Sequence, residues 1–479
     1  MFLVTTPIYY VNDEPHIGHF YTTLAADVLA RYHRALGEKV FFLTGTDEHG
    51  LKMQKAAQER GLDPKELADK NAGIFKSLWD ELGISYDRFI RTTEKDHIEL
   101  VKEVFTKCKE NGFIYKGEYS GWYCVGCEEF KPESELLEGN ACPIHLKPCE
   151  YISEPTYFFR LSAFGDFLKD FLNSNAVMPK ERVKEMLSFI QEGLKDLSVT
   201  RPRSRVSWGI PVPFDKDHTI YVWFDALFNY VSGLPSWPAS LHLVGKDILR
   251  FHSLYWPSFL NSIGFQLPQR IFAHGWWKVE GQKMSKSLGN VLKPLDLVRD
   301  FGLDEIRYFL LREIPFGDDG DISKDAILRR INAELSNNVG NLYSRVVGIA
   351  TKFGKSSITG VKDINYCQRA EEFVKSYHDK MANVDFYGAL EEVMSFCMFL
   401  NKYVDTKAPW ALSDEDAILN TLYALFDGIC LVCSSLEPFM PNKMRVALSA
   451  IGVEEPIFAP CEKPSYRVIN KLTLFPRRA

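Results

Sequence analysis

The sequence lacks an apolar run of membrane-spanning length, because the best candidate, 422–440, is interrupted by Asp427 and Glu437. It also lacks an N-terminal signal or transit pattern, since it begins directly with a short apolar strand. These two absences predict a soluble, cytoplasmic protein, although they leave a role inside an organelle open.

An excess of basic charge is missing as well. The chain has 57 Lys and Arg against 63 Asp and Glu, a net charge of −6. This balance excludes a strongly basic coat for nucleic acid, so any RNA contact must use local patches. The length of 479 residues and 46% hydrophobic content are those of a globular protein with two to four domains. Ten cysteines without a secretory signal predict thiols, metal ligands or core residues rather than disulfides.

The tetrapeptide His-Ile-Gly-His at 16–19 lies between an apolar strand at 1–6 and a helix predicted over 20–36. The start of a helix offers free backbone N–H groups and a positive dipole end, which suit a phosphate. Gly18 leaves room for a ligand, and the imidazoles of His16 and His19 can donate to phosphate oxygens. The alternative is that these histidines are solvated or cap the helix.

A second strand at 39–44 runs into the polar stretch 45–50. Strand, helix and strand form the βαβ unit of a doubly wound parallel sheet, whose ligands bind at the carboxyl ends of the strands. We therefore expect both loops to open onto one crevice, where Asp47 would receive a cation such as an amino group. The alternative is that Asp47 caps the following helix.

A late basic stretch, Lys-Met-Ser-Lys-Ser, occupies 283–287. Lys283 and Lys286 can clamp a polyanion, although an ordinary solvated basic loop is the alternative. The combination of this stretch with His-Ile-Gly-His in one α/β domain is far more specific than either motif, and it resembles the class I aminoacyl-tRNA synthetases.

A metal site is predicted between these motifs. Cys124 and Cys127 form one pair with two intervening residues, and Cys142 and His145 form another. Such spacing is typical of a closed, structural zinc site, and Cys149 is the rival fourth ligand. A closed site has no open position for a substrate thiol, which argues against a cysteinyl relative. The basic cluster 201–205 that follows could contact RNA, lie in solvent or act as a structural clamp.

Further strands are expected at 220–226, 242–248 and 271–276, with a helix carrying 251–256. The order of these stretches resembles the methionyl family within class I. That resemblance implies a methionine pocket at Ile8, Tyr10, Asp47, Trp223, Ala226, Tyr230, Ile248, His252 and Trp256. Aromatic rings around a thioether fit this assignment, since each sulfur–ring contact contributes about 0.3–1.5 kcal/mol.

The resemblance implies two reactions: ATP-dependent activation of methionine to methionyl-adenylate with release of pyrophosphate, then transfer of methionine to the 3′ end of tRNA(Met). Magnesium would accompany ATP. No residue is a convincing general base, so positioning and charge stabilisation should dominate. The ATP-binding residues implied are His16, Gly18, His19, Gly245, Asp247, Lys283 and Lys286. The two histidines and two lysines are assigned to the triphosphate, with Lys286 as the main group for the transition state.

From 331 onward the pattern is all-helical, with helices expected over 331–351, 368–402, 416–437 and 441–450. Within this bundle the resemblance implies an anticodon reader at Asn341, Arg345 and Trp410, where the indole would stack on a splayed base. Without the resemblance, Asn341 would cap or bridge helices and Trp410 would be core. Cys430 and Cys433 lie in an apolar run and are predicted to be core.

The fold class predicted is α/β: a Rossmann-like catalytic domain with a zinc-bearing insertion, followed by an all-α bundle. The predicted segments are a first catalytic half, a connective insertion, a second catalytic half, a stem-contact linker and an anticodon domain, at 1–114, 115–218, 219–270, 271–330 and 331–479. A monomer is expected, because the chain stops just after the bundle.

Two other functions stay open. One is a different class I synthetase or an adenylate-forming nucleotidyltransferase, although the interval between 16 and 283 is short for relatives with an editing domain. The other is a non-catalytic RNA-binding protein, which would have no use for both phosphate motifs.

Overall fold

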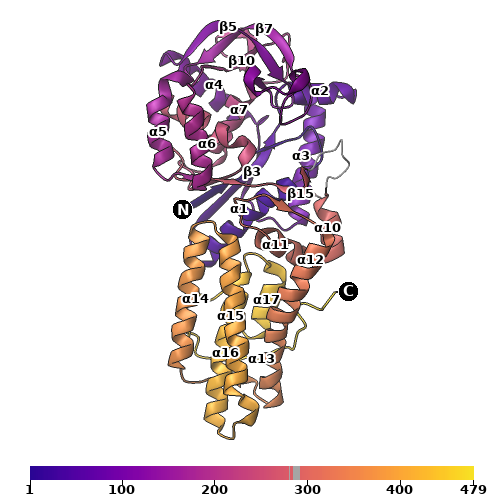
Figure 1. Ribbon diagram of the computed structural model, residues 1–479, viewed down its shortest axis with the longest axis vertical. Coiled ribbons are helices and arrows are strands. Elements are labelled where there is room, and N and C mark those ends of the chain that lie inside the picture. Colours follow the sequence, from indigo (N-terminus) through magenta and orange to yellow (C-terminus); the bar gives the residue numbers. More distant parts are fainter. Residues whose placement is uncertain (280, 284–291, 479) are drawn as a thin grey trace. The chain divides into compact units, whose positions relative to one another are not determined.

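The computed structural model describes residues 1–279, 281–283 and 292–478. The chain folds into two compact units (Figure 1). The first unit consists of Met1–Pro15 and Glu38–His274, and the second consists of His16–Gly37 and Gly275–Ala479. The first helix of the chain therefore belongs to a different unit from the strands on either side of it in sequence.

A parallel sheet of seven strands forms the centre of the first unit, with the order β2-β3-β1-β13-β14-β8 and β4 added to β3. β1 lies between β3 and β13, with Phe2 opposite Val40 and Val4 opposite Leu241. The strands are β1 Phe2–Thr5, β2 Tyr9–Tyr10, β3 Val40–Asp47, β4 Arg88–Arg91, β8 Val177–Met178, β13 Leu241–Gly245 and β14 Ile271–His274. The doubly wound parallel sheet predicted from the sequence is confirmed. The stretch expected to be a loop from 45 onward is strand as far as Asp47.

Helices surround this sheet, and several begin just after a strand. They are α2 Leu51–Glu59, α3 Pro64–Glu81, α4 Lys95–Glu110, α7 Val222–Leu227, α8 Asn229–Gly233, η4 Lys246–Ile248, the π-helical η5 Phe251–Tyr255 and α9 Trp256–Ser262. The strand expected at 220–226 is wrong beyond Ile220, because α7 begins at Val222. Four of the six residues of α7 are apolar or aromatic and buried, so no periodicity distinguished helix from strand.

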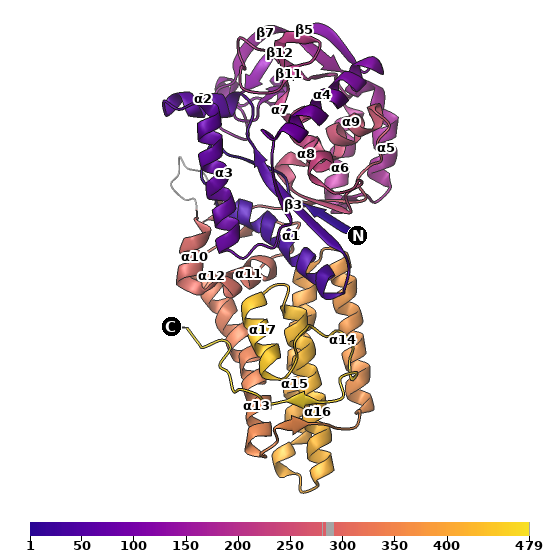
Figure 2. The same cartoon turned by 180° about the vertical axis from the view of Figure 1, so that it is seen from behind.

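The connective insertion folds into two small antiparallel sheets, drawn in Figure 2 around β5, β7 and β12. Their strands are β5 Ile114–Cys124, β6 Glu129–Lys131, β7 Glu150–Phe159, β9 Leu197–Ser198, β10 Thr200–Pro202, β11 Pro211–Val212 and β12 Asp215–Ile220, and the helices are α5 Gly165–Asn173 and α6 Lys180–Gln191. β8, which lies between α5 and α6, pairs with β14 of the main sheet. The insertion is thus tied to the main sheet by one of its own strands.

The basic cluster 201–205 has a structural role here. Arg201 is buried, and its guanidinium lies 4.7 Å from the ring centre of Tyr221 and 5.2 Å from that of Tyr123. Arg205 forms an ion pair with Glu150 at 3.0 Å. Of the three interpretations, the structural clamp is the one that these contacts support.

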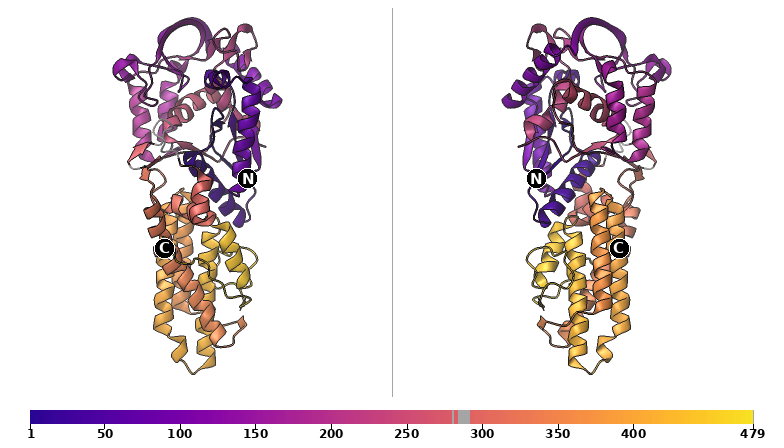
Figure 3. Two further views of the ribbon diagram at one scale, coloured as in Figure 1. Left: turned by 90° about the vertical axis from the view of Figure 1, so that its right-hand side faces the viewer. Right: turned by 90° about the vertical axis from the view of Figure 1, so that its left-hand side faces the viewer.

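The second unit is mainly helical, and Figure 3 shows the long helices of its bundle side by side. Its elements are α1 Ile17–Ala35, β15 Trp277–Val279, β16 Gln282–Lys283, α10 Pro294–Phe301, α11 Leu303–Arg312, β17 Gly320–Asp321, α12 Lys324–Arg330, the π-helical η7 Ile331–Gly340, α13 Asn341–Lys352, β18 Ser357–Ile358, α14 Ile364–Ala382, α15 Phe386–Lys407, η8 Pro409–Ala411, α16 Glu415–Leu436, α17 Pro441–Ala450 and β19 Tyr466–Arg467. The predicted all-α bundle is confirmed.

The single helical stretch expected over 368–402 is two helices, α14 and α15. Val384 between them has a positive φ of 61°, and Asp385 then caps α15 by accepting from the backbone N–H of Gly388 at 2.8 Å. The apolar periodicity continues across this break, which is why the sequence pattern did not reveal it.

The expectation that no apolar run reaches membrane-spanning length needs correction for helix α16. Among the described residues α16 is long and apolar enough to cross a membrane by length and composition, but 83% of its most apolar window is buried inside the structure, as in a core helix. Asp427, which interrupts the run, is itself buried and accepts from the hydroxyls of Tyr366 and Tyr466 at 2.7 Å.

Cys367 and Cys461 form a disulfide, so the expectation that no cysteines pair was wrong. Cys430 and Cys433 are buried, as predicted.

Candidate active site and metal centre

Asp47 lies at the carboxyl end of β3, opposite Tyr10 of β2 in the sheet register. Its side chain is 4% exposed, and its Oδ1 has no hydrogen-bond partner among the residues that the structure describes. Burial, with further contributions from Asp225 and Glu128, raises the pKa of Asp47 well above its usual range. Gly50, and not Asp47, precedes helix α2 as its N-cap. A buried carboxylate with an unsatisfied oxygen is a receptor for a cation.

The aromatic side chains of the predicted methionine set lie against one another in the first unit. Tyr10 contacts Trp223 edge-on at 6.4 Å between ring centres, and Trp223 contacts His252 in the same way at 6.4 Å. Tyr230 lies 5.9 Å from Trp256. The other members occupy neighbouring positions: Ala226 is on α7, Ile248 on η4, and Ile8 lies between β1 and β2. Folding thus brings together residues from three separate stretches of the chain, 8–10, 223–230 and 248–256.

His252 is locked into one tautomer. Burial lowers its pKa to about 4, so the ring is neutral near neutral pH. Its Nδ1 lies 2.9 Å from the carbonyl oxygen of Ile248, which can only accept, so Nδ1 carries the hydrogen. Nε2 must then accept from the hydroxyl of Tyr230 at 2.7 Å. This arrangement fixes the direction of the Tyr230 hydroxyl before any ligand enters.

Two residues that contact the predicted methionine set were missed by sequence reasoning. Phe251 stacks on Trp223 with ring centres 3.8 Å apart, and Glu128 accepts from the hydroxyl of Tyr10 at 3.2 Å. The position of Phe251 beside His252 was the one signal that could have found it. Nothing in the sequence marked Glu128, because its contact joins positions 118 residues apart.

His16 and His19 are at the start of α1, in the second unit. The Nδ1 of His16 accepts from the backbone N–H of Gly18 at 3.1 Å, and the Nδ1 of His19 accepts from the backbone N–H of His16 at 3.1 Å. Their rings stack with centres 3.9 Å apart. The predicted placement at a helix start is confirmed, and so is the capping role given as its alternative. In a neutral ring whose Nδ1 accepts, Nε2 carries the hydrogen and can donate to an anion.

The remaining predicted ATP residues are distributed between the units. Gly245 ends β13 and exposed Asp247 follows in η4, both in the first unit. A Cβ on Gly245 would lie 2.6 Å from Oδ1 of Asp247, so a larger residue there would displace the exposed Asp247 side chain. Lys283 is in β16 of the second unit, and Lys286 lies outside the described residues.

The predicted metal ligands converge. Nδ1 of His145 lies 3.8, 3.4 and 3.9 Å from the sulfur atoms of Cys124, Cys127 and Cys142. Zn–S and Zn–N bonds of about 2.3 and 2.1 Å in a tetrahedral site place ligand atoms roughly 3.6–3.8 Å apart, so the set fits zinc. The backbone N–H of Cys127 also points at the sulfur of Cys124 at 3.4 Å, which favours the thiolate.

Cys149 is buried beside this cluster but is not among the four residues whose ligand atoms converge. Gly126 makes room for the fourth ligand, since a Cβ there would lie 2.7 Å from the ring of His145. This close approach supports His145 over Cys149 as the fourth ligand.

The predicted anticodon residues are in the second unit. The guanidinium of Arg345 on α13 lies 5.6 Å from the ring centre of Trp410 in η8, and Arg345 forms an ion pair with Asp405. The Trp410 side chain is 49% exposed, so the core alternative is wrong for it. Asn341 is exposed on the same helix as Arg345. The Asp405 partner was missed, because nothing in its local sequence marks it.

The chain is similar to known proteins of one family. The family model described as tRNA synthetases class I (M) matches residues 2–151 and 133–347. A methionine–tRNA ligase of Caldanaerobacter subterraneus is 45% identical over 95% of this chain and 74% of its own length. A chloroplastic and mitochondrial methionine–tRNA ligase of Arabidopsis thaliana is 42% identical over 95% of this chain and 78% of its own. The structure of Mycobacterium tuberculosis methionyl-tRNA synthetase in complex with methionyl-adenylate has a TM-score of 0.94 and 38% identity, covering 99% of both chains.

Proposed function

The chain belongs to the methionyl-tRNA synthetases of class I, and from that premise we propose which of its own residues perform the reaction. The enzyme activates methionine with ATP, releasing pyrophosphate, and transfers the methionyl group from the adenylate to tRNA(Met). In the first step a carboxylate oxygen of methionine attacks the α-phosphorus and pyrophosphate leaves. In the second a terminal ribose hydroxyl attacks the methionyl carbonyl and AMP leaves.

Asp47 binds the α-amino group of methionine. The observation that carries this assignment is the buried Oδ1 of Asp47 without a partner among the described residues, beside Tyr10 at the edge of the aromatic set. An ammonium group would satisfy this oxygen and would also favour the ionised form of a carboxylate whose pKa is raised by burial.

The aromatic set binds the thioether side chain of methionine. Tyr10, Trp223, Tyr230 and His252 supply ring faces and edges, and the hydroxyl of Tyr230 is already directed at His252. Polar side chains would have to give up hydration without finding partners there, and small side chains would fill the pocket poorly. Ile8, Ala226, Ile248 and Trp256 complete the pocket.

His16, His19, Lys283 and Lys286 bind the phosphates of ATP, together with Mg²⁺. The capping contacts make Nδ1 of each histidine an acceptor, so Nε2 is the nitrogen that would donate to a phosphate oxygen. The lysines add positive charge as pyrophosphate leaves, with Lys286 as the main contributor. Gly18 and Gly245 allow the ligand to lie close to the backbone, and Asp247 accepts from ribose hydroxyls.

Zinc is held by Cys124, Cys127, Cys142 and His145, where it supplies no chemistry and stabilises the fold of the insertion. Four protein ligands close the coordination sphere. The backbone oxygen of Cys127 accepts from the indole N–H of Trp223 at 3.4 Å. The folded metal-binding segment therefore also supports Trp223, one of the proposed pocket residues.

Asn341, Arg345 and Trp410 read the anticodon. The half-exposed indole offers a face for a base, and the guanidinium and amide can donate to base edges. We further propose a monomeric enzyme that works in the cytoplasm, and the presence of all three residue sets in one chain supports the monomer. Sedimentation with tRNA and fractionation of cells would test these two points.

The decisive experiment is amino-acid-dependent exchange of pyrophosphate into ATP, measured without tRNA for all standard amino acids. Methionine alone should support exchange, and Asp47→Asn should raise the KM for methionine by roughly 30-fold or more, because it leaves a buried ammonium without its counter-ion. Asp217→Asn, an exposed aspartate in the insertion, is the matched control and should behave as wild type. Exchange with a different amino acid would contradict the pocket assignment, and no exchange at all from the zinc-loaded protein would favour an RNA-binding role.

A further inference from the structure

Three consecutive residues at the end of β3 carry ionisable side chains that are all buried. Asp47 is 4% exposed, Glu48 is fully buried and His49 is 5% exposed. Asp47 keeps an oxygen without a partner among the described residues, whereas its two neighbours are bound at several points. Burying ionisable side chains costs free energy, so the contacts of Glu48 and His49, on either side of the proposed amine receptor Asp47, call for an explanation.

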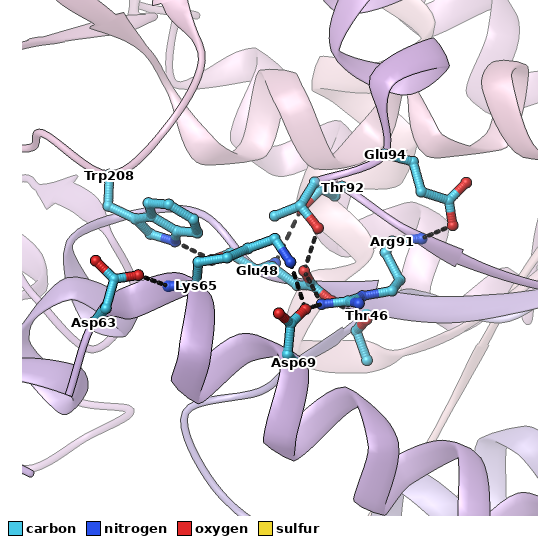
Figure 4. Close-up of polar contacts among 10 residues, drawn as sticks. Thr46, Glu48, Asp63, Lys65, Asp69, Arg91, Thr92, Glu94 and Trp208 are labelled. Carbon is cyan, nitrogen blue, oxygen red and sulfur yellow. Dashed lines mark hydrogen bonds and ion pairs between the residues drawn. The ribbon is translucent and has the colours of Figure 1, made fainter.

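Glu48 is anchored to the neighbouring strand, β4. Its two carboxylate oxygens accept from Nε and Nη2 of Arg91 at 2.6 and 2.9 Å, and Oε1 also accepts from the hydroxyl of Thr46 at 2.8 Å (Figure 4). The backbone N–H of Glu48 donates to Thr92 at 3.0 Å. Arg91 is in turn paired with Asp69 of α3. These contacts hold the strand end against β4 on one side.

His49 is anchored to α7 by Asp225. Nδ1 of His49 lies 2.7 Å from Oδ2 of Asp225, and the other oxygen of that carboxylate lies 2.7 Å from Nε2 of His97 on α4. Nδ1 of His97 is bonded to the hydroxyl of Ser232 at 2.8 Å. His97 and Asp225 are 0% and 1% exposed, so solvent does not weaken these bonds. Each oxygen of Asp225 therefore has its own imidazole partner.

Asp225 lies between two residues of the proposed methionine pocket, Trp223 and Ala226, on the short helix α7. Its bond to His49 thus connects the helix that lines the pocket with the strand end that carries Asp47. The two carboxylates differ in state: burial and the charge of Asp225 raise the pKa of Asp47, whereas the two histidines outweigh burial and lower the pKa of Asp225. Asp225 is paired, and Asp47 is left to receive the ligand.

We propose that Asp225 is a positioning residue for amine recognition: through His49 and His97 it fixes the carboxylate of Asp47 relative to the pocket helix. Asp225, His49 and His97 are not among the residues proposed to contact methionine, so Asp225 is a positioning residue and not a catalytic one. This inference rests on the proposed assignment of Asp47 to the α-amino group of methionine.

The test compares two ligands that differ only in the amine, L-methioninol and 4-(methylthio)butan-1-ol. Their dissociation constants are measured by titration of tryptophan fluorescence on the full chain. Asp225→Asn should weaken L-methioninol binding by roughly tenfold, the order expected when a buried hydrogen-bonded anchor is lost, while binding of the deaminated alcohol changes by less than about twofold. A defect that is merely structural would weaken both ligands alike.

Asp215→Asn is the matched control, because it removes a hydrogen-bonded aspartate of the same unit that pairs with Tyr157 and Lys116, in the insertion. It should leave the ratio of the two dissociation constants unchanged. If Asp225→Asn does not fold, the variants His97→Ala and His97→Gln test the positioning role instead. Alanine should cause the amine-selective loss, and glutamine, whose amide can reach the place of Nε2, should restore most of the affinity.

The variant Asp47→Asn distinguishes a failure of this inference from a failure of the proposal that Asp47 binds the α-amino group. If Asp47→Asn loses amine selectivity and the Asp225 and His97 variants keep it, the positioning role is overturned and the assignment of Asp47 stands. If Asp47→Asn binds both ligands as wild type does, the assignment itself is overturned, and the positioning role with it. Equal weakening of both ligands by Asp225→Asn also contradicts the inference.

Discussion

The proposed methionine pocket of the first unit and the Arg345–Trp410 pair of the second are built in opposite ways. In the pocket, Tyr230 and His252 are buried and their hydrogen bond is formed in advance. In the bundle, Trp410 is 49% exposed and Arg345 is paired with Asp405, whose side chain is 63% exposed. Buried hydrogen bonds are strong and rigid, whereas exposed ion pairs contribute about 0–1 kcal/mol. The proposed amino-acid site is therefore rigid before a ligand binds, whereas the proposed anticodon site consists of exposed side chains.

The largest effect should come from metal removal, which would disrupt the insertion of the first unit, the unit with the buried, preformed contacts. Cys142→Ser should lose zinc and disorder residues 124–149, since binding at such sites supplies roughly 10–16 kcal/mol in peptides. Metal content by atomic absorption and backbone hydrogen exchange measure both effects. Cys149→Ser is the matched control and should keep its zinc; loss of zinc from Cys149→Ser instead would show that Cys149 is the fourth ligand.

The next largest effect should come from filling the pocket. Ala226 is 4% exposed on α7, and Ala226→Leu inserts a branched side chain where the thioether is proposed to lie. We expect methionine-dependent exchange to fall by 100-fold or more, at a stability cost of about 1–3 kcal/mol for overpacking. Thermal unfolding measures that cost. Retained exchange with an unchanged KM would show that methionine binds elsewhere.

The pH dependence of methionine binding should follow Asp47. Its pKa is raised by burial and by the neighbouring carboxylates of Asp225, Glu128 and Glu48, and the ammonium of methionine binds the ionised form. As the pH falls through this raised pKa, protonation removes the counter-ion, and the KM should rise by up to about tenfold per pH unit. The rise should begin at a higher pH than an ordinary aspartate would give. A KM that stays flat across this range would mean that another group receives the amine.

A smaller effect is expected for the exposed Arg345–Trp410 pair of the second unit. Trp410→Ala should raise the KM for tRNA by an amount equal to about 1–3 kcal/mol, the contribution of one stacked base, while exchange without tRNA stays as in wild type. Met398→Ala removes another exposed apolar side chain of the bundle, 58% exposed, and is the matched control. Equal losses in both variants would indicate a general surface effect.

The smallest effect is expected for Asp405→Asn. The ion pair of Asp405 with Arg345 is exposed, so its loss should change bundle stability by less than about 1 kcal/mol. Aminoacylation at limiting tRNA should change by no more than a few-fold. A loss as large as that of Trp410→Ala would mean that the ion pair orients Arg345 for RNA, and that this patch is as preorganised as the pocket.

Sequence reasoning succeeded where the chemistry is local. The metal ligands come in pairs with two intervening residues, and the two histidines stand at a helix start. It failed where a pattern is uniform: the largely buried α7 has no periodicity to identify it as a helix, and the break at Val384 lies inside continuous apolar spacing. The disulfide between Cys367 and Cys461 joins positions 94 residues apart and has no local signature.

By itself, the sequence determined the class of protein, the parallel sheet and the zinc-like set of ligands, because each depends on spacing over a few residues or on motifs in a set order. Only the tertiary structure decided which buried groups are paired. Asp225 and Asp47 are both buried aspartates, yet one is held by His49 and His97, up to 176 residues away, and the other keeps a free oxygen within the described part of the chain. The electrostatic state of a buried carboxylate depends on neighbours in space, which local sequence does not encode.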